Sequence, residues 1–114
     1  MTIFEILEQT GRSYFRYGTV PAENPSDFFT FFNIDSIGLL PADNNDNLMA
    51  EWYDICYYSE DPQTIYTEID NFIKLAKQAD WIIVQYPKDL ETDEPHLLCR
   101  MVRVCRIIPN PITD

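Results

Sequence analysis

Histidine and glycine are scarce in this chain of 114 residues, which contains one histidine and three glycines. A Ser/His/Asp or Cys/His catalytic site would therefore have to use His96. This residue follows Pro95 in an acidic segment with no nucleophile nearby in sequence. The glycines, at positions 11, 18 and 38, are too far apart to form a glycine-rich phosphate-binding loop. We expect His96 to be a solvated loop residue, and we predict no catalytic residue.

Long apolar runs and zinc-type cysteine spacings are also missing. No apolar run approaches the ~20 residues that span a bilayer, and the first residues are acidic, unlike a secretory signal. The third cysteine, Cys56, leaves an odd count. Cys99 and Cys105 would share one face of a strand about 20 Å apart, too far to form a disulfide. We expect three reduced, buried cytosolic thiols, with no metal and no cofactor.

Basic residues are absent from the middle of the chain. The segment 17–73 holds eleven acids and no lysine, arginine or histidine, whereas the remaining residues carry eight acids and eight lysines or arginines. The whole net charge of −11 therefore comes from this segment. Nucleic-acid and anionic-membrane binding both require a basic surface, so we expect neither.

The residue pattern predicts two helices and five strands in one domain. Thr2 and Glu5 fit a capping box for a short first helix, and Asp61 with Pro62 begins a second helix that ends near Ala79. Strands are expected at 13–17, 28–34, 51–59, 81–86 and 97–108, and segment 81–86 is expected to be buried. This order, α-β-β-β-α-β-β, predicts an α+β fold, an antiparallel sheet of four to five strands with both helices on one face. The domain covers residues 1–108, and residues 109–114 form a tail.

The acidic sequence DNNDN (43–47) partly matches a calcium-binding loop. Asp43, Asn45, Asn47 and Asp54 fall at positions 1, 3, 5 and 12 of that template, but Leu48 stands where a glycine is required. Strand periodicity follows the segment instead of a helix, and Asn and Asp are ordinary turn residues. We therefore interpret DNNDN as a turn.

The strongest candidates for contacts are arginine and aromatic residues. Arg100, Arg103 and Arg106 recur every third residue, which on a regular strand places Arg103 on the face opposite the other two. They can pair with the acidic strands of the same chain or with another subunit, head to tail. In the second case, reversing Arg103 or Arg106 to Glu weakens self-association more than it lowers the melting temperature. Sixteen aromatics are many for one small core, and such residues are enriched at subunit interfaces. The aromatic interface candidates are Phe29, Phe31, Trp52 and Tyr57.

Four segments together resemble the small tail-terminator, or tail-completion, proteins of long-tailed bacteriophages of Gram-positive hosts. They are the N-terminal TIFEILEQTG, the proline-marked VPAENPSDFFTFF, the turn and aromatic strand PADNNDNLMAEWYDICYYS, and the helical DPQTIYTEIDNFIKLAKQADW. The resemblance is one of order and character over residues 2–108, with Ala42-Asp43-Asn44 as its most pointed detail. The chain departs from it at Asp80-Trp81, where the family often has glycine, and in a last strand that has Cys and Arg where tyrosine is frequent.

The resemblance implies a non-enzymatic virion protein. Such proteins form a ring, commonly hexameric, that caps the tail tube and binds the head-tail connector, after assembly in the bacterial cytoplasm. The expected partners are other copies of the chain, the major tail tube protein and the connector. A negative wall also suits a lumen through which DNA must pass without binding. The alternatives are another head-tail joining protein or an acidic inhibitor, either a nuclease immunity protein or a DNA mimic.

Overall fold

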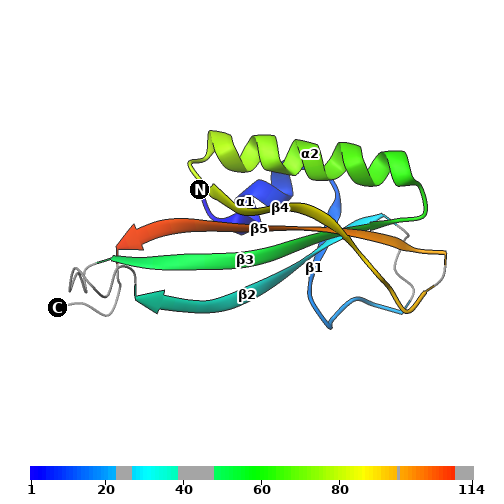
Figure 1. Ribbon diagram of the computed structural model, residues 1–114, viewed down its shortest axis with the longest axis horizontal. Coiled ribbons are helices and arrows are strands. Elements are labelled where there is room, and N and C mark those ends of the chain that lie inside the picture. Colours follow the sequence, from blue (N-terminus) through cyan, green and yellow to red (C-terminus); the bar gives the residue numbers. More distant parts are fainter. Residues whose placement is uncertain (23–26, 39–47, 95, 110–114) are drawn as a thin grey trace.

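A single sheet carries two helices on one of its faces. The computed structural model describes residues 1–22, 27–38, 48–94 and 96–109, with the backbone alone at 35–38. The elements are α1 (Ile3–Gln9), β1 (Ser13–Arg16), β2 (Phe28–Gly38), β3 (Leu48–Ser59), α2 (Pro62–Gln78), β4 (Ile82–Leu90) and β5 (Leu98–Pro109). Their order is the predicted one, and the α+β class is confirmed (Figure 1).

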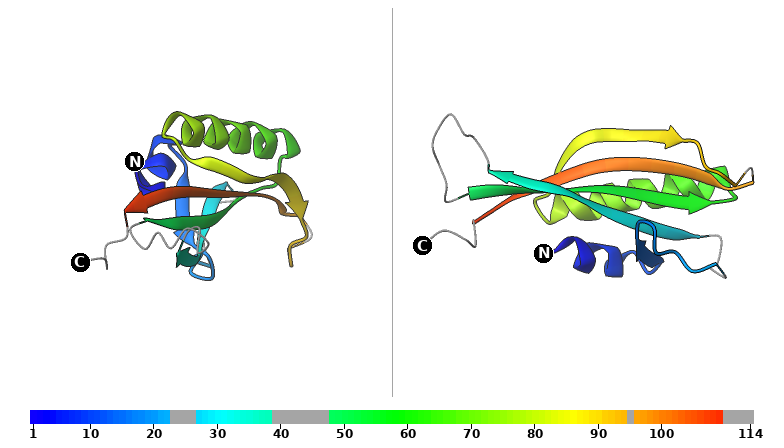
Figure 2. Two further views of the ribbon diagram at one scale, coloured as in Figure 1. Left: turned by 60° about the vertical axis from the view of Figure 1, so that its left-hand side comes forward. Right: turned by 90° about the horizontal axis from the view of Figure 1, so that it is seen from below.

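The sheet has the strand order β1-β2-β3-β5-β4, so the last strand of the chain lies between β3 and β4. Three of the four strand pairs are antiparallel, but β1 is parallel to β2. The sheet is therefore mixed, not antiparallel throughout as the sequence suggested. A parallel neighbour requires the chain to return to the starting end of the sheet between Arg16, the last residue of β1, and Phe28, the first residue of β2. Figure 2 shows how strongly the strands twist along their length.

Both helices begin at the predicted capping residues. In α1, the amide of Glu5 donates to Thr2 Oγ1 (3.2 Å) and the amide of Thr2 donates to Glu5 Oε1 (2.9 Å), which completes the capping box. In α2, Asp61 accepts hydrogen bonds from the Thr64 hydroxyl and the Gln63 amide. These bonds lower the pKa of Asp61, with the Thr64 bond as the larger cause.

The main core lies between the helices and one face of the sheet. Alternate residues of β3 point toward the helices, as strand periodicity requires. Phe72, in the middle of α2, is fully buried, and its ring lies 5.9 Å from that of Phe29 on β2. The buried residues of this core are Ile3, Ile6, Leu7, Phe29, Tyr53, Ile55, Tyr57, Ile65, Ile69, Phe72, Ala76, Trp81, Val102 and Val104.

The opposite, helix-free face of the sheet is also largely apolar. Phe28, Cys56, Cys99 and Met101 on this face are at most 8% exposed. An apolar groove of about 230 Å³ lies over part of it; its lining residues are Tyr17, Thr30, Phe32, Asp54, Cys56, Leu90 and Met101. The aromatic residues on one face of β2 and β3 thus pack beneath the helices, and those on the other face belong to this second apolar surface.

The prediction that segment 81–86 is a buried strand is wrong. Strand β4 is an edge strand, and Ile82, Val84 and Tyr86 are 49%, 40% and 62% exposed. Its pairing with β5 shifts register between Ile83 and Gln85 and again between Gln85 and Lys88. Only the side chain of Ile83 packs against the core from this stretch of β4. An edge position explains both the exposure and the bulges, which are common there.

Candidate interaction surfaces

All three arginines of β5 form ion pairs within the chain. The pairs, at N–O distances of 2.7 to 2.8 Å, are Arg100–Asp89, Arg103–Asp54 and Arg106–Glu51. Arg100 stacks over the Tyr66 ring of α2 (4.6 Å) and thus lies on the helix-bearing face, whereas Arg103 lies on the other face with its partner. The alternation that the three-residue spacing predicts is therefore present. Each of the three arginines is thus paired with an acid of the same chain. An interface role for these arginines stays a prediction.

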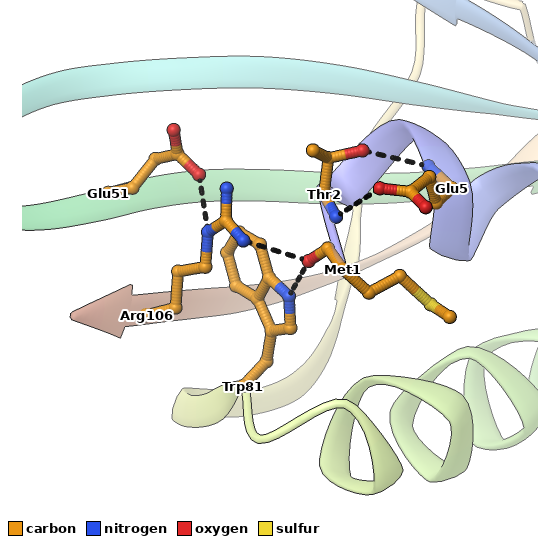
Figure 3. Close-up of polar contacts among 6 residues, drawn as sticks. All are labelled: Met1, Thr2, Glu5, Glu51, Trp81 and Arg106. Carbon is orange, nitrogen blue, oxygen red and sulfur yellow. Dashed lines mark hydrogen bonds and ion pairs between the residues drawn. The ribbon is translucent and has the colours of Figure 1, made fainter. Parts of the chain in front are cut away.

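Arg106 belongs to a cluster that fixes the first residue of the chain (Figure 3). Its Nη1 donates to the Met1 carbonyl oxygen at 3.0 Å, and Trp81 Nε1 donates to the same oxygen at 3.0 Å. The guanidinium also lies 5.0 Å from the Trp81 ring centre, while its Nε donates to Glu51 Oε1 at 2.8 Å. One side chain thus joins β5, β3 and the start of α1.

Replacement of Trp81 by phenylalanine tests this cluster. We expect Trp81→Phe to lower the free energy of unfolding by about 2 kcal/mol, because the Met1 carbonyl loses a donor and Arg106 loses its best stacking partner. The measurement is chemical denaturation. Trp52→Phe is the matched control, since Trp52 is half-buried on the helix-free face and donates no hydrogen bond among the described residues. Equal losses in the two variants would contradict the role given to the indole nitrogen.

Ion pairing partly neutralises the acidic middle of the chain. Arg12 Nε lies 3.2 Å from Glu68 Oε1, in addition to the pairs of Arg103 and Arg106. In each of these three pairs an acid from segment 17–73 meets an arginine from outside it. The hydrogen bonds that Arg103 donates to the Asp54 carboxylate raise the pKa of Arg103. The acidic and basic residues that are separated along the sequence therefore lie closer together in the folded chain.

The four aromatic candidates lie in different environments. Phe29 and Tyr57 are fully buried in the main core, so neither offers surface to a partner. Phe31 is half-buried and meets the Phe4 ring of α1 edge-on at 5.1 Å. Trp52 is half-buried on the helix-free face. Only Phe31 and Trp52 among the four can contribute part of their side chains to an interface.

Several exposed apolar side chains instead lie at the two edges of the sheet, while Tyr66 of α2 and Leu98 and Ile107 of the central strand β5 are exposed elsewhere. Ile82, Val84 and Tyr86 follow one another along β4, and Phe32 of β2 is 48% exposed at the other edge. Phe4, 42% exposed, lies beside this second edge on the helix-bearing face. None of these residues is among the interface candidates that the sequence suggested. The signal that marks β4 as an edge strand is Pro87-Lys88, since proline and lysine are typical of strand edges.

A second groove, of about 540 Å³, lies beside the acidic connection between β4 and β5. Its lining combines aromatic and acidic residues: Tyr17, Phe28, Tyr58, Glu91, Asp93 and Glu94 are among them. The three acids are exposed and form no ion pair among the described residues. His96 is exposed and lies 3.8 Å from Glu60 Oε1.

The three cysteines are free and buried, as predicted. Cys56 on β3 and Cys99 on β5 share one face, and a hydrogen bond between their thiols raises the pKa of Cys56. Burial raises the pKa of Cys105 as well. The hydrogen bond to Cys56 lowers the pKa of Cys99. The Cys56 side chain is only 8% exposed, so little of it is accessible to a substrate.

Within the described residues no three His, Cys, Asp or Glu side chains form a metal-binding group. The DNNDN segment, on which the calcium question depends, lies outside the described residues, and so do Ala42 and Asp43 of the family resemblance. No helix in the described part of the chain is long and apolar enough to cross a membrane. Comparison with known proteins adds no identity, since no protein-family model and no curated protein matches the chain.

Proposed function

We propose that this chain is a structural protein of long-tailed bacteriophages, which forms a ring on the end of the tail tube and joins it to the head connector. The observation that carries the proposal is the position of its exposed apolar side chains. Five of them lie at opposite edges of the sheet, with Phe32 of β2 and the neighbouring Phe4 of α1 at one edge and Ile82, Val84 and Tyr86 at the other. A subunit with two different contact surfaces makes head-to-tail contacts, and these close into a ring when the rotation permits.

The charge of the chain is compatible with this role. Net charge −11 remains after the arginines are paired, because pairing within one chain leaves the total unchanged. A negative ring repels the phosphates of DNA that passes through it, so the DNA does not bind to the wall. The identification with tail terminators depends on the sequence resemblance, while the exposed edges support self-assembly in general.

A second candidate function is inhibition of a basic protein. The groove beside Glu91, Asp93 and Glu94 places carboxylates that form no ion pair within the described residues next to aromatic rings, which suits a surface rich in lysine and arginine. The three acids of this groove lie outside the 17–73 segment from which the sequence suggested such a surface, whereas its aromatic residues lie within that segment. A nuclease immunity protein or DNA mimic would use it as a monomer.

The first function can be tested by adding the purified chain to tail tube protein of the same phage while that protein polymerises. We expect the purified chain to stop tube growth and to occupy tube ends, visible by electron microscopy with a labelled chain. Tubes that grow to the same length with and without the chain would contradict the terminator proposal. A stoichiometric complex with a basic nuclease, formed by the monomer and lost in Glu91→Lys, would favour the inhibitor instead.

A further inference from the structure

We infer that copies of this chain associate through strand pairing, with β4 of one copy adding to the uncovered half of β2 in the next. This inference deepens the self-assembly proposed above and rests on it. It specifies the surface, the partner, which is a second copy of the chain, and the direction of the contact.

The first observation is that β2 is covered along only part of its outer edge. Strand β1 pairs with Phe28–Phe31 and stops there. From Phe32 to Ile34 the described residues place β3 on one side of β2 and no strand on the other. Among the described residues, the Tyr17 amide donates to the Phe31 carbonyl oxygen on that outer side, and beyond Phe31 the backbone groups that face outward form no hydrogen bond, so this part of β2 can pair with another strand.

The second observation is that the unprotected parts of the two edges lie at the same level. Across the sheet, Phe32 pairs with Asp54, Asp54 with Arg103, and Arg103 with Gln85. The parallel row runs from Ile34 through Trp52 and Cys105 to Ile82. A sheet that continues without a shift along the strands therefore brings Gln85 and Ile82 of one copy beside Phe32 and Ile34 of the next.

The protected parts of the two edges also correspond. Pro87 cannot donate to a ladder, and it lies in a stretch of β4 where the register shifts. Lys88 follows, opposite Met101, in the row that contains Thr30 at the part of β2 that β1 covers. Strand pairing is thus blocked on both edges in the row of Thr30 and Lys88. It is open on both edges in the row of Phe32 and Gln85.

The third observation is polarity. Three successive antiparallel pairs separate β2 from β4, so these two strands run in opposite directions within one copy. When copies repeat in the same orientation, β4 of one meets β2 of the next in antiparallel fashion. Antiparallel addition at an edge is a common mode of association in which backbone hydrogen bonds supply affinity.

Charge and apolar character are complementary on the helix-bearing side of these edges. On the β4 side, Lys77 Nζ lies 3.4 Å from Tyr86 Oη. On the other side, Glu8 of α1 accepts a hydrogen bond from Tyr14 of β1 at 2.7 Å, and Phe4 is exposed beside it. When β4 of one copy adds to β2 of the next, Lys77 and Tyr86 of the first copy approach Glu8 and Phe4 of the second. These features favour a second copy of the chain over an unrelated partner.

Matched lysine substitutions test the surface. Val84 on the β4 edge and Leu98, the first residue of β5, are both 40% exposed. We expect Val84→Lys to weaken self-association about 10-fold or more in sedimentation equilibrium, because it places a charge among the apolar edge residues, and Leu98→Lys to change it less than ~2-fold. Equal effects of the two variants, or a monomer at every concentration up to millimolar, would overturn the inference.

Cysteine cross-linking tests the pairing itself. Preparations of Phe32→Cys and Gln85→Cys are mixed and oxidised with copper–phenanthroline, in solution and on tail tubes. Directly paired residues on antiparallel strands bring their Cα atoms to about 4.5–5.5 Å, which a disulfide can span. We expect a disulfide between the two variants, whereas Gln85–Gln85 or Phe32–Phe32 products alone would show a two-fold contact and refute this one. A cross-linked assembly that fails to cap tubes would refute the tail function and leave the strand pairing intact.

Discussion

Replacing Phe72 with alanine is expected to lower the free energy of unfolding by about 4 kcal/mol, the largest effect of any single substitution considered for this chain. Phe72 has no exposed area, and it lies between α2 and the aromatic rings of the sheet. Truncation removes the apolar contacts of the whole ring and leaves a cavity that neighbouring side chains fill only in part. For a domain of this size the melting temperature should fall by roughly 15 °C.

The measurement is thermal unfolding followed by circular dichroism, with two controls. Phe72→Leu keeps most of the volume and should cost about a third as much. Lys74→Ala on the exposed face of the same helix should change stability by less than about 0.5 kcal/mol. A loss below about 1 kcal/mol for Phe72→Ala would mean that α2 does not pack on the sheet as described.

Reversal of Arg106 to glutamate is expected to destabilise the fold by about 3 kcal/mol. The change places a carboxylate beside Glu51 and removes both the hydrogen bond to the Met1 carbonyl and the cation over the Trp81 ring. The sequence alone suggested that such a reversal acts mainly on self-association. The intramolecular contacts of Arg106 change that expectation, because its side chain is only 22% exposed and is paired within the chain.

Chemical denaturation of Arg106→Glu beside Arg16→Glu separates these effects. Arg16 is exposed and has no ion pair among the described residues, so the same change of charge there should cost less than about 1 kcal/mol. If both reversals cost the same, the loss would come from overall charge and not from the cluster around Met1. If Arg106→Glu leaves stability unchanged and abolishes self-association, the interface role suggested by the sequence is correct.

Local patterns predicted the elements well because the signals for helices and strands are local. Thr2, Glu5, Asp61 and Pro62 mark helix starts by hydrogen bonding and backbone geometry that involve only neighbouring residues. Strand alternation likewise placed Arg103 on the face opposite Arg100 and Arg106. The faces of β3 and β5 could be assigned before any partner strand was known.

Strand neighbours could not be predicted in the same way. Whether Ile82 and Val84 are buried depends on whether another strand lies beyond β4, and the alternation of a strand carries no information on that point. The same limit applies to Arg106, whose contacts with Met1 and Glu51 join residues that are far apart in sequence. The contact surface that the fold suggests therefore lies at the sheet edges and not at the arginines.

The place of β5 between β3 and β4 also constrains how the molecule reaches its native state. During translation β3, α2 and β4 leave the ribosome before β5, yet the only sheet neighbour of β4 among the described strands is β5. The edge of β3 that faces β4 therefore has no strand partner until β5 has been synthesised and inserts between β3 and β4. Because this ladder joins distant segments, its formation carries a large loop-closure entropy, which makes folding slow compared with a helical bundle of the same length.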